Sequence, residues 1–324
     1  MKNLLRAFVV LFLLAGLVVG IGGSLLAQKP VYTVYVVVHG GIGDPYWKKV
    51  ENGVKDAAAL YPDLKVIYTG PDVYHFEQFM GILEGAIAAR PDGLLATMTN
   101  PPAMDELLRG AIAEGLPVIA IDSPDSRPPL DRIPYLSYVG ELPYEGGVLG
   151  AMEALKTFRP KRTMYGNHHP GALNIQERGQ GFIDVMADAG IPSEAIDITA
   201  DAVRAAEIQL AYIRAHPDTD LIFGANVLRA ETLVTRLEEE EIKPGVDVKI
   251  ITFGVTPTTL DMIEDGKIMF SIDEQPYLQG WLGVSFMYLH LKYGFTPPSE
   301  IPTLGLFPKE TIGSLRELIE QGIR

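Results

Sequence analysis

From residue 31 onward, short apolar runs alternate with longer segments in which apolar residues recur every three or four positions. The short runs are typical of strands buried on both faces, and the longer spacing is typical of amphipathic helices. Strands are predicted at residues 31–38, 65–68, 93–97, 118–121, 162–165, 195–199, 221–224, 249–253 and 267–272. Helices are predicted at residues 45–60, 76–89, 104–114, 144–157, 176–189, 204–215, 230–240, 258–265 and 279–291. This alternation predicts an α/β protein with parallel sheets covered on both faces.

The alternation occurs twice, which predicts two doubly wound halves. The proline-rich residues 123–135 form the most linker-like stretch and are predicted to be a surface loop. We expect the chain to cross to the second half at about 139–142 and to return near 275–276. The first lobe is thus predicted to comprise residues 29–140 and about 276–294, and the second about 141–275 and 295–324. The proline-rich tail at 294–308 is expected to wrap over the second half.

Residues 1–28 have the pattern of a signal peptide. Lys2 and Arg6 precede an apolar and glycine run at residues 7–21, and small residues around Ala27 offer a cleavage site. The alternative is an uncleaved anchor, because a run of about 20 apolar or small residues is just long enough to span a bilayer. We therefore expect an exported, extracytoplasmic protein.

Composition narrows the function further. The chain has no cysteine, which excludes disulfides, thiolate catalysis and a lipid anchor on cysteine. Without Lys2 and Arg6, 25 basic residues remain against 41 acidic ones, a net charge of −16. So acidic a chain is unsuited to nucleic acids and to anionic membrane surfaces.

Candidate binding residues follow the predicted strands. Asp44, Tyr46 and Trp47 come just after the first strand, and Asp273 and Gln275 come just after a strand near the end of the chain. Open α/β sheets bind ligands at the carboxyl ends of their strands. Carboxylates and amides hydrogen-bond to hydroxyl groups, and aromatic rings stack on the apolar faces of sugars. These residues predict a cleft for a small polyhydroxylated molecule.

Other motifs are weaker. Adjacent His168 and His169 point apart on a loop and have no third ligand at a useful spacing, so a contact at the rim of the cleft is expected instead of a metal. The glycines at 40–43 fail the dinucleotide-binding pattern, because Tyr46 occupies the position of the last glycine. The sequence has no phosphate-binding loop, nucleophile elbow or catalytic triad. We expect a binding protein with no metal or cofactor, not an enzyme.

Taken in order along residues 30–324, several segments resemble the type I periplasmic solute-binding proteins of ABC transporters, specifically the ribose-, galactose- and autoinducer-binding group. The segments that carry the resemblance are 44–47, 91–95, 115–122, 138–141 with 146–147, 177–182, 223–226, 252–254 and 273–277. The resemblance implies two Rossmann-like lobes joined by a three-strand hinge, with the ligand trapped in the cleft between them.

The same resemblance implies the roles of individual residues. Tyr46 and Trp47 would stack on a sugar ring, Asp122 would accept hydroxyls, and Arg178 would donate from the second lobe. Asn226 and Gln275 would both donate and accept. The full set of candidate ligand-binding residues is Asp44, Tyr46, Trp47, Asn100, Asp122, Glu141, Arg178, Asn226, Phe253, Asp273 and Gln275.

Two positions depart from the family pattern. Gly254 stands where the family often has aspartate, and Ser123 stands where it often has arginine. Asp273 or Glu141 could compensate for the missing charges. The expected function is capture of a sugar or related polyol by hinge closure, and delivery by a monomer to an ABC permease. Alternatives are a ligand-sensing role for a membrane receptor or kinase, or a non-sugar solute such as an autoinducer furanose or a nucleoside. A DNA-binding regulator is excluded by the export signal.

Overall fold

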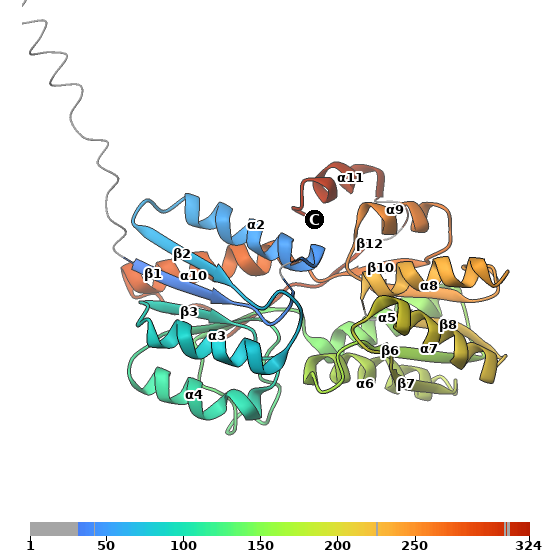
Figure 1. The fold of residues 1–324 in the computed structure, drawn as a ribbon, viewed down its shortest axis with the longest axis horizontal. Coiled ribbons are helices and arrows are strands. Elements are labelled where there is room, and N and C mark those ends of the chain that lie inside the picture. Colours follow the sequence, from blue (N-terminus) through green and yellow to red (C-terminus); the bar gives the residue numbers. More distant parts are fainter. Residues whose placement is uncertain (1–31, 42, 225, 308, 310–311) are drawn as a thin grey trace, which may run out of the picture.

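The computed structural model describes residues 32–41, 43–224, 226–307, 309 and 312–324. It consists of two α/β lobes that lie side by side (Figure 1). Among the described residues, each lobe contains one six-stranded sheet, with strand orders β11-β5-β4-β3-β1-β2 and β12-β10-β9-β8-β6-β7. The strands are parallel except where β12 pairs antiparallel with β10. The predicted fold class is confirmed.

In the first lobe, helices cover both faces of the sheet. The strands are β1 (Tyr32–Val37), β2 (Leu64–Thr69), β3 (Gly93–Ala96), β4 (Val118–Asp122), β5 (Ser137–Gly140) and β11 (Glu300–Pro302). The helices are α2 (Pro45–Ala59), α3 (Phe76–Ala88), α4 (Pro101–Ala113) and α10 (Pro276–Tyr293). Apolar residues of α2 and α10 pack together on one face, and those of α3 and α4 pack on the other. Burial on both faces explains why these strands are continuously apolar.

The second lobe repeats this arrangement. Its strands are β6 (Arg162–Asn167), β7 (Ser193–Asp197), β8 (Thr219–Gly224), β9 (Lys249–Phe253), β10 (Phe270–Asp273) and β12 (Gly305–Phe307). Its helices are α5 (Pro143–Thr157), α6 (Leu173–Asp188), α7 (Ala202–Ala215), α8 (Val227–Glu239), α9 (Pro257–Glu264) and α11 (Ile312–Glu320). Residues of α5 and α6 cover one face, and the remaining helices contribute to the core on the other.

Glycines allow one pair of helices in each lobe to pack closely. A Cβ at Gly53 of α2 would collide with the backbone carbonyl of Tyr277 in α10, and a Cβ at Gly147 of α5 would collide with that of Arg178 in α6. Only glycine permits backbones to approach this closely. The second pair of helices fixes the backbone of Arg178 beside the junction of the two lobes.

Among the described residues, the chain passes between the sheets at Glu141–Leu142, at Glu274–Gln275 and at Thr303–Leu304. The third passage corrects the prediction that residues 295–324 lie wholly with the second lobe. Residues 300–302 instead form β11 and pair with β5 at the edge of the first sheet. The physical reason is that α10 returns the chain to the first lobe, so the segment after it meets the open edge of that sheet.

The predicted signal peptide at residues 1–28 lies outside the described residues. Within the part of the chain that the structure describes, no helix combines the length and the apolar character needed to cross a lipid bilayer.

Candidate functional site

A cavity of about 60 Å³ lies where the two lobes meet. Trp47 and Asp122 line it from the first lobe, Arg178 and Asn226 from the second, and Glu274 from a chain crossing. A cavity needs about 10–15 Å³ to hold one water molecule, so this space accommodates several. This size suits one small molecule.

The first lobe presents its side chains from the ends of β1 and β4. Asp44 caps α2 by accepting a hydrogen bond from the Tyr46 backbone N–H at 2.9 Å, and Pro45 starts the helix. Asp122 ends β4 in the left-handed conformation, with φ of 64°. Aspartate is one of the few residues that tolerate this conformation, and the turn brings its carboxylate to the cavity.

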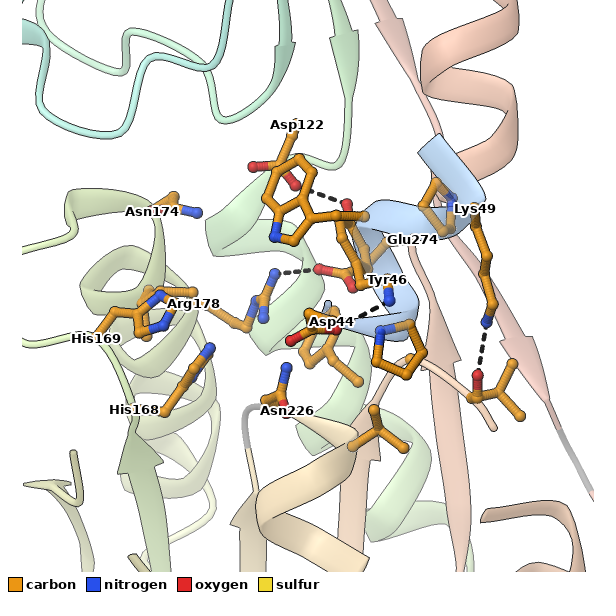
Figure 2. Close-up of a pocket in the computed structure, with 18 of the residues that line it drawn as sticks. Asp44, Tyr46, Lys49, Asp122, His168, His169, Asn174, Arg178, Asn226 and Glu274 are labelled. Atoms are coloured by element: carbon orange, nitrogen blue, oxygen red, sulfur yellow. Dashed lines mark hydrogen bonds and ion pairs between the residues drawn. The ribbon is translucent and has the colours of Figure 1, made fainter. Parts of the chain in front are cut away.

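Hydroxyl groups hold the Asp122 carboxylate in place. The Tyr46 hydroxyl donates to Asp122 Oδ1 at 2.6 Å (Figure 2). The Ser123 hydroxyl donates to Oδ2 at 2.7 Å. Burial raises the pKa of Asp122, although these two hydrogen bonds oppose the shift. Ser123 thus supports the carboxylate from a fully buried position. The arrangement provides an oriented acceptor for a ligand hydroxyl.

In the second lobe, Arg178 of α6 is 3% exposed and is held by two carboxylates. Its Nη2 donates to Glu274 Oε1 at 2.5 Å and to Glu141 Oε1. The guanidinium carbon also lies 3.7 Å from the centre of the Phe253 ring, a cation–π contact. Burial raises the pKa of Glu274, while the charge of Arg178 opposes the shift. The buried cation is therefore matched by acidic partners.

The Asn226 side chain has a fixed orientation. Its Oδ1 accepts hydrogen bonds from the Leu228 backbone N–H at 2.9 Å and from Arg229 Nη1 at 3.0 Å. The oxygen is thus used within the protein, whereas the NH₂ group donates no hydrogen bond to the residues that the structure describes. The expectation that Asn226 both donates and accepts is corrected on this point. The reason is that Asn226 is also the cap of α8.

Three histidines line the cavity: His39 from the first lobe, and His168 and His169 from the second. Tyr74 of the first lobe stacks on His169, with ring centres 4.4 Å apart and an interplanar angle of 14°. The Nδ1 atoms of His39 and His168 are buried and have no hydrogen-bond partner among the described residues. The Nδ1 atom of His39 lies 3.9 Å from Asp122 Oδ2.

We expect acid to destabilise the folded protein through these histidines. Burial lowers the pKa of His39 and of His169 to about 3, below the value of about 6.5 for a solvated histidine. The folded state therefore binds fewer protons than the unfolded chain below pH 6.5. Above pH 6.5 these histidines cost the folded state nothing. Between pH 6.5 and about pH 3, each lowers the free energy of unfolding by about 1.4 kcal/mol per pH unit of acidification.

The measurement is thermal unfolding at pH 7.5, 6.0 and 5.0 for the wild type and for His169→Asn. The variant is expected to lose less stability on acidification. Burial raises the pKa of Asp44 and of Asp122, which acts in the opposite direction, so the histidine contribution is read from the difference between proteins. His75→Asn is the control, because the His75 side chain is 64% exposed. Equal acid sensitivity in both variants would contradict the prediction.

The Lys49 side chain connects the two lobes. It lies on α2, is 6% exposed, and donates from Nζ to the backbone carbonyl of Val255 in the second lobe at 2.6 Å (Figure 2). Burial lowers its pKa to about 8. Further contacts between described residues of the two lobes include the Tyr74–His169 stack, a hydrogen bond from the Ser126 hydroxyl to Glu177, and one from the Asn52 amide to the Gly322 carbonyl at 3.2 Å. These contacts join the two lobes directly.

The structure brings most of the predicted site residues together. Asp44, Tyr46, Trp47, Asp122, Arg178, Asn226, Phe253 and Asp273 all line the cavity. Glu141 is 1% exposed and lies behind Arg178. Asn100 lies outside the cavity lining, because its side chain caps α4. Gln275 also lies outside it, because a φ of 52° directs its amide toward Gly305.

Sequence reasoning missed several lining residues: His39, Lys49, Asn174 and Glu274. Glu274 lies between the predicted Asp273 and Gln275. Strand alternation would place only one of two neighbours on a face, but β10 ends at Asp273, and both Asp273 and Glu274 line the cavity. His168 and His169, expected at the rim, are part of the lining. Among the described residues, no group of three histidine or acidic side chains is arranged to hold a metal ion.

Two α/β lobes that close on a polar and aromatic cavity at the ends of their strands define a two-lobe solute-binding protein. The chain belongs to the periplasmic binding protein family, whose domain model matches residues 34–294. The predicted family is thereby confirmed. Members of this family bind substrates without transforming them, so the expectation of a binding protein is confirmed as well.

Curated and solved relatives agree with this assignment. The chain is 27% identical over 283 residues to the xylose/arabinose-binding protein of Sulfolobus acidocaldarius, covering 83% of this chain and 69% of the relative. A periplasmic sugar-binding protein from Legionella pneumophila is 26% identical, with a TM-score of 0.77 over 85% of this chain and all of the other. A carbohydrate transporter from Acidothermus cellulolyticus, solved with myo-inositol, shares the fold with a TM-score of 0.81 at 22% identity, over 91% of this chain and all of the other.

Proposed function

We propose that this chain captures a monosaccharide or a related polyol and delivers it to an ABC import permease. The observation that carries the proposal is the cavity between the lobes, whose lining combines the Trp47 ring with the Asp122 carboxylate and the Asn226 amide. A sugar offers apolar ring faces to the aromatic residue and hydroxyl groups to the polar ones. The relatives from Sulfolobus acidocaldarius and Legionella pneumophila support a sugar as the ligand class.

Capture proceeds by closure of the lobes around the ligand. A ligand bridging Asp122 of the first lobe and Asn226 of the second contacts both only when the cleft is closed. Such differential affinity is what shifts the population from open to closed. The closed protein, as a monomer exported through its N-terminal segment, then presents the ligand to the permease.

The test is thermal unfolding of residues 28–324, freed of co-purified ligand and screened against pentoses, hexoses, inositols, nucleosides and amino acids. At about 1,000 times the Kd, a ligand that binds only the native state adds roughly 4 kcal/mol of stability. This is expected to raise Tm by several degrees for one sugar or polyol. A shift given only by a nucleoside or an amino acid would overturn the ligand class and leave the fold assignment intact.

A further inference from the structure

The cavity is lined by more acidic than basic side chains. Among the described lining residues, Asp44, Asp122, Asp273 and Glu274 are acidic, while Lys49 and Arg178 are the cations. Asp273 is paired with Arg324 at 2.6 Å. Glu274 shares Arg178 with Glu141, so this one cation can balance only one of the two carboxylates. An anionic ligand needs a cation that it can approach without also approaching these carboxylates.

Arg178 does not offer such a cation. Its guanidinium lies between Glu141 and Glu274, and two carboxylates around one cation leave a net negative charge. Glu274 belongs to the cavity lining, whereas Glu141 lies behind it. A ligand carboxylate approaching Arg178 from the cavity would therefore meet Glu274 at the same place.

Lys49 does not offer one either. Its ammonium group points away from Asp44 and Asn226 and ends at the Val255 carbonyl, 2.6 Å away (Figure 2). Moving it toward a ligand would break this bond between the lobes. A third cation, Arg229, lies outside the cavity lining and donates to Asn226 Oδ1 at 3.0 Å. Its charge and that of Lys49 act on Asp44, so Arg229 already has a carboxylate beside it.

The position of Glu274 is tightly fixed. The Gln279 amide donates to its backbone carbonyl at 2.9 Å, and the Thr303 hydroxyl donates to the same oxygen at 2.7 Å. These bonds join the beginning of α10 to the third crossing between the lobes. The carboxylate, which is 7% exposed, therefore keeps its place in the cavity.

We propose that Glu274 is a specificity-determining residue that makes the cavity reject anionic sugars, so that the ligand is an uncharged monosaccharide or polyol. This inference rests on the proposed function and narrows its substrate class. A ligand anion placed beside the Glu274 carboxylate in a desolvated site would be strongly repelled. Such repulsion is one way in which a binding site rejects the wrong ligand. Sugar acids and sugar phosphates are the ligands excluded.

The test compares neutral and acidic sugars by isothermal titration calorimetry on wild-type protein at pH 7.5. The neutral probes are D-xylose, D-ribose, L-arabinose, D-glucose, D-galactose and myo-inositol; the acidic ones are D-xylonate, D-gluconate, D-glucuronate and D-galacturonate. The tightest binder is expected among the neutral probes, with every acid at least about 100-fold weaker. An acid that binds as tightly would overturn the inference and leave the proposed function standing. Absence of binding by every probe would overturn both this inference and the proposed function.

The role of Glu274 is tested with Glu274→Gln, which keeps the size of the side chain and an oxygen acceptor for Arg178. The ratio of the Kd for the acidic sugars to the Kd for the neutral sugars is expected to fall at least about tenfold. Glu194→Gln is the matched control, because it removes one charge from an exposed glutamate paired with Arg162. An unchanged preference in Glu274→Gln, folded by circular dichroism, would refute the role of Glu274. The wild-type comparison tests anion exclusion without any variant.

Discussion

Replacing Arg178 with methionine is expected to destabilise the ligand-free protein by about 3–5 kcal/mol, because it leaves two buried carboxylates without their cation. Glu141 is 1% exposed and Glu274 is 7% exposed, so bulk solvent compensates poorly for the lost cation. The cation–π contact with Phe253 is lost at the same time. Methionine fills much of the volume of the arginine stem, so the main effect is electrostatic.

The measurement is urea denaturation at pH 7.5. Arg214→Met is the control, since Arg214 pairs with Glu240 on the surface and its side chain is 57% exposed. That variant is expected to change stability by about 1 kcal/mol or less. The triple variant Arg178→Met, Glu141→Gln, Glu274→Gln should recover part of the loss, because all three charges of this cluster are then removed. A loss below 1 kcal/mol in Arg178→Met would refute the account of this cluster.

Replacing Asp122 with asparagine is expected to weaken sugar binding about 10- to 100-fold while leaving the fold intact. Asparagine also tolerates the left-handed backbone at this position, and its size matches that of aspartate. What is lost is a charged acceptor, whose hydrogen bonds are roughly twice as strong as neutral ones. A ligand hydroxyl left poorly paired in the cavity costs about 1–3 kcal/mol.

The measurement is the Kd of the sugar found in the thermal screen. Asn100→Ala is the matched control, because Asn100 caps α4 and does not line the cavity. It is expected to lose about 1 kcal/mol of stability with an unchanged Kd. Equal Kd values for wild type and Asp122→Asn would remove Asp122 from the binding site. A larger Kd in Asn100→Ala would show that the binding site includes Asn100, which the structure places outside the cavity lining.

Most helices and strands could be predicted from the sequence because their apolar periodicity is strong. The helix predicted at 45–60 is α2 (Pro45–Ala59), and the strand predicted at 249–253 is β9 (Lys249–Phe253). The strands β5 (Ser137–Gly140), β11 (Glu300–Pro302) and β12 (Gly305–Phe307) were missed, and so was helix α11 (Ile312–Glu320). The strands β11 and β12 have three residues each, carry no periodic signal, and form because tertiary structure brings them to the edges of existing sheets.

The candidate site was predictable where strand ends deliver side chains to a common edge. Asp44, Asp122 and Asn226 follow this rule, and all three line the cavity. The rule does not extend past the last residue of a strand. β10 ends at Asp273, and the left-handed Gln275 that was chosen turns away from the cavity, whereas Glu274 lines it. It also gives no account of Lys49, whose partner Val255 is 206 residues away in the chain.

The sequence by itself determined the α/β class, the two-lobe organisation and the family, because local periodicity and ordered landmarks need no knowledge of long-range contacts. Only the tertiary structure decided how the charges are paired. Arg178 could equally have faced water on its helix, and its enclosure by Glu141 and Glu274 depends on where two separate crossings between the lobes meet α6. The energy of a charge depends on burial and on neighbours from other segments, and neither quantity is encoded in the spacing of residues along the chain.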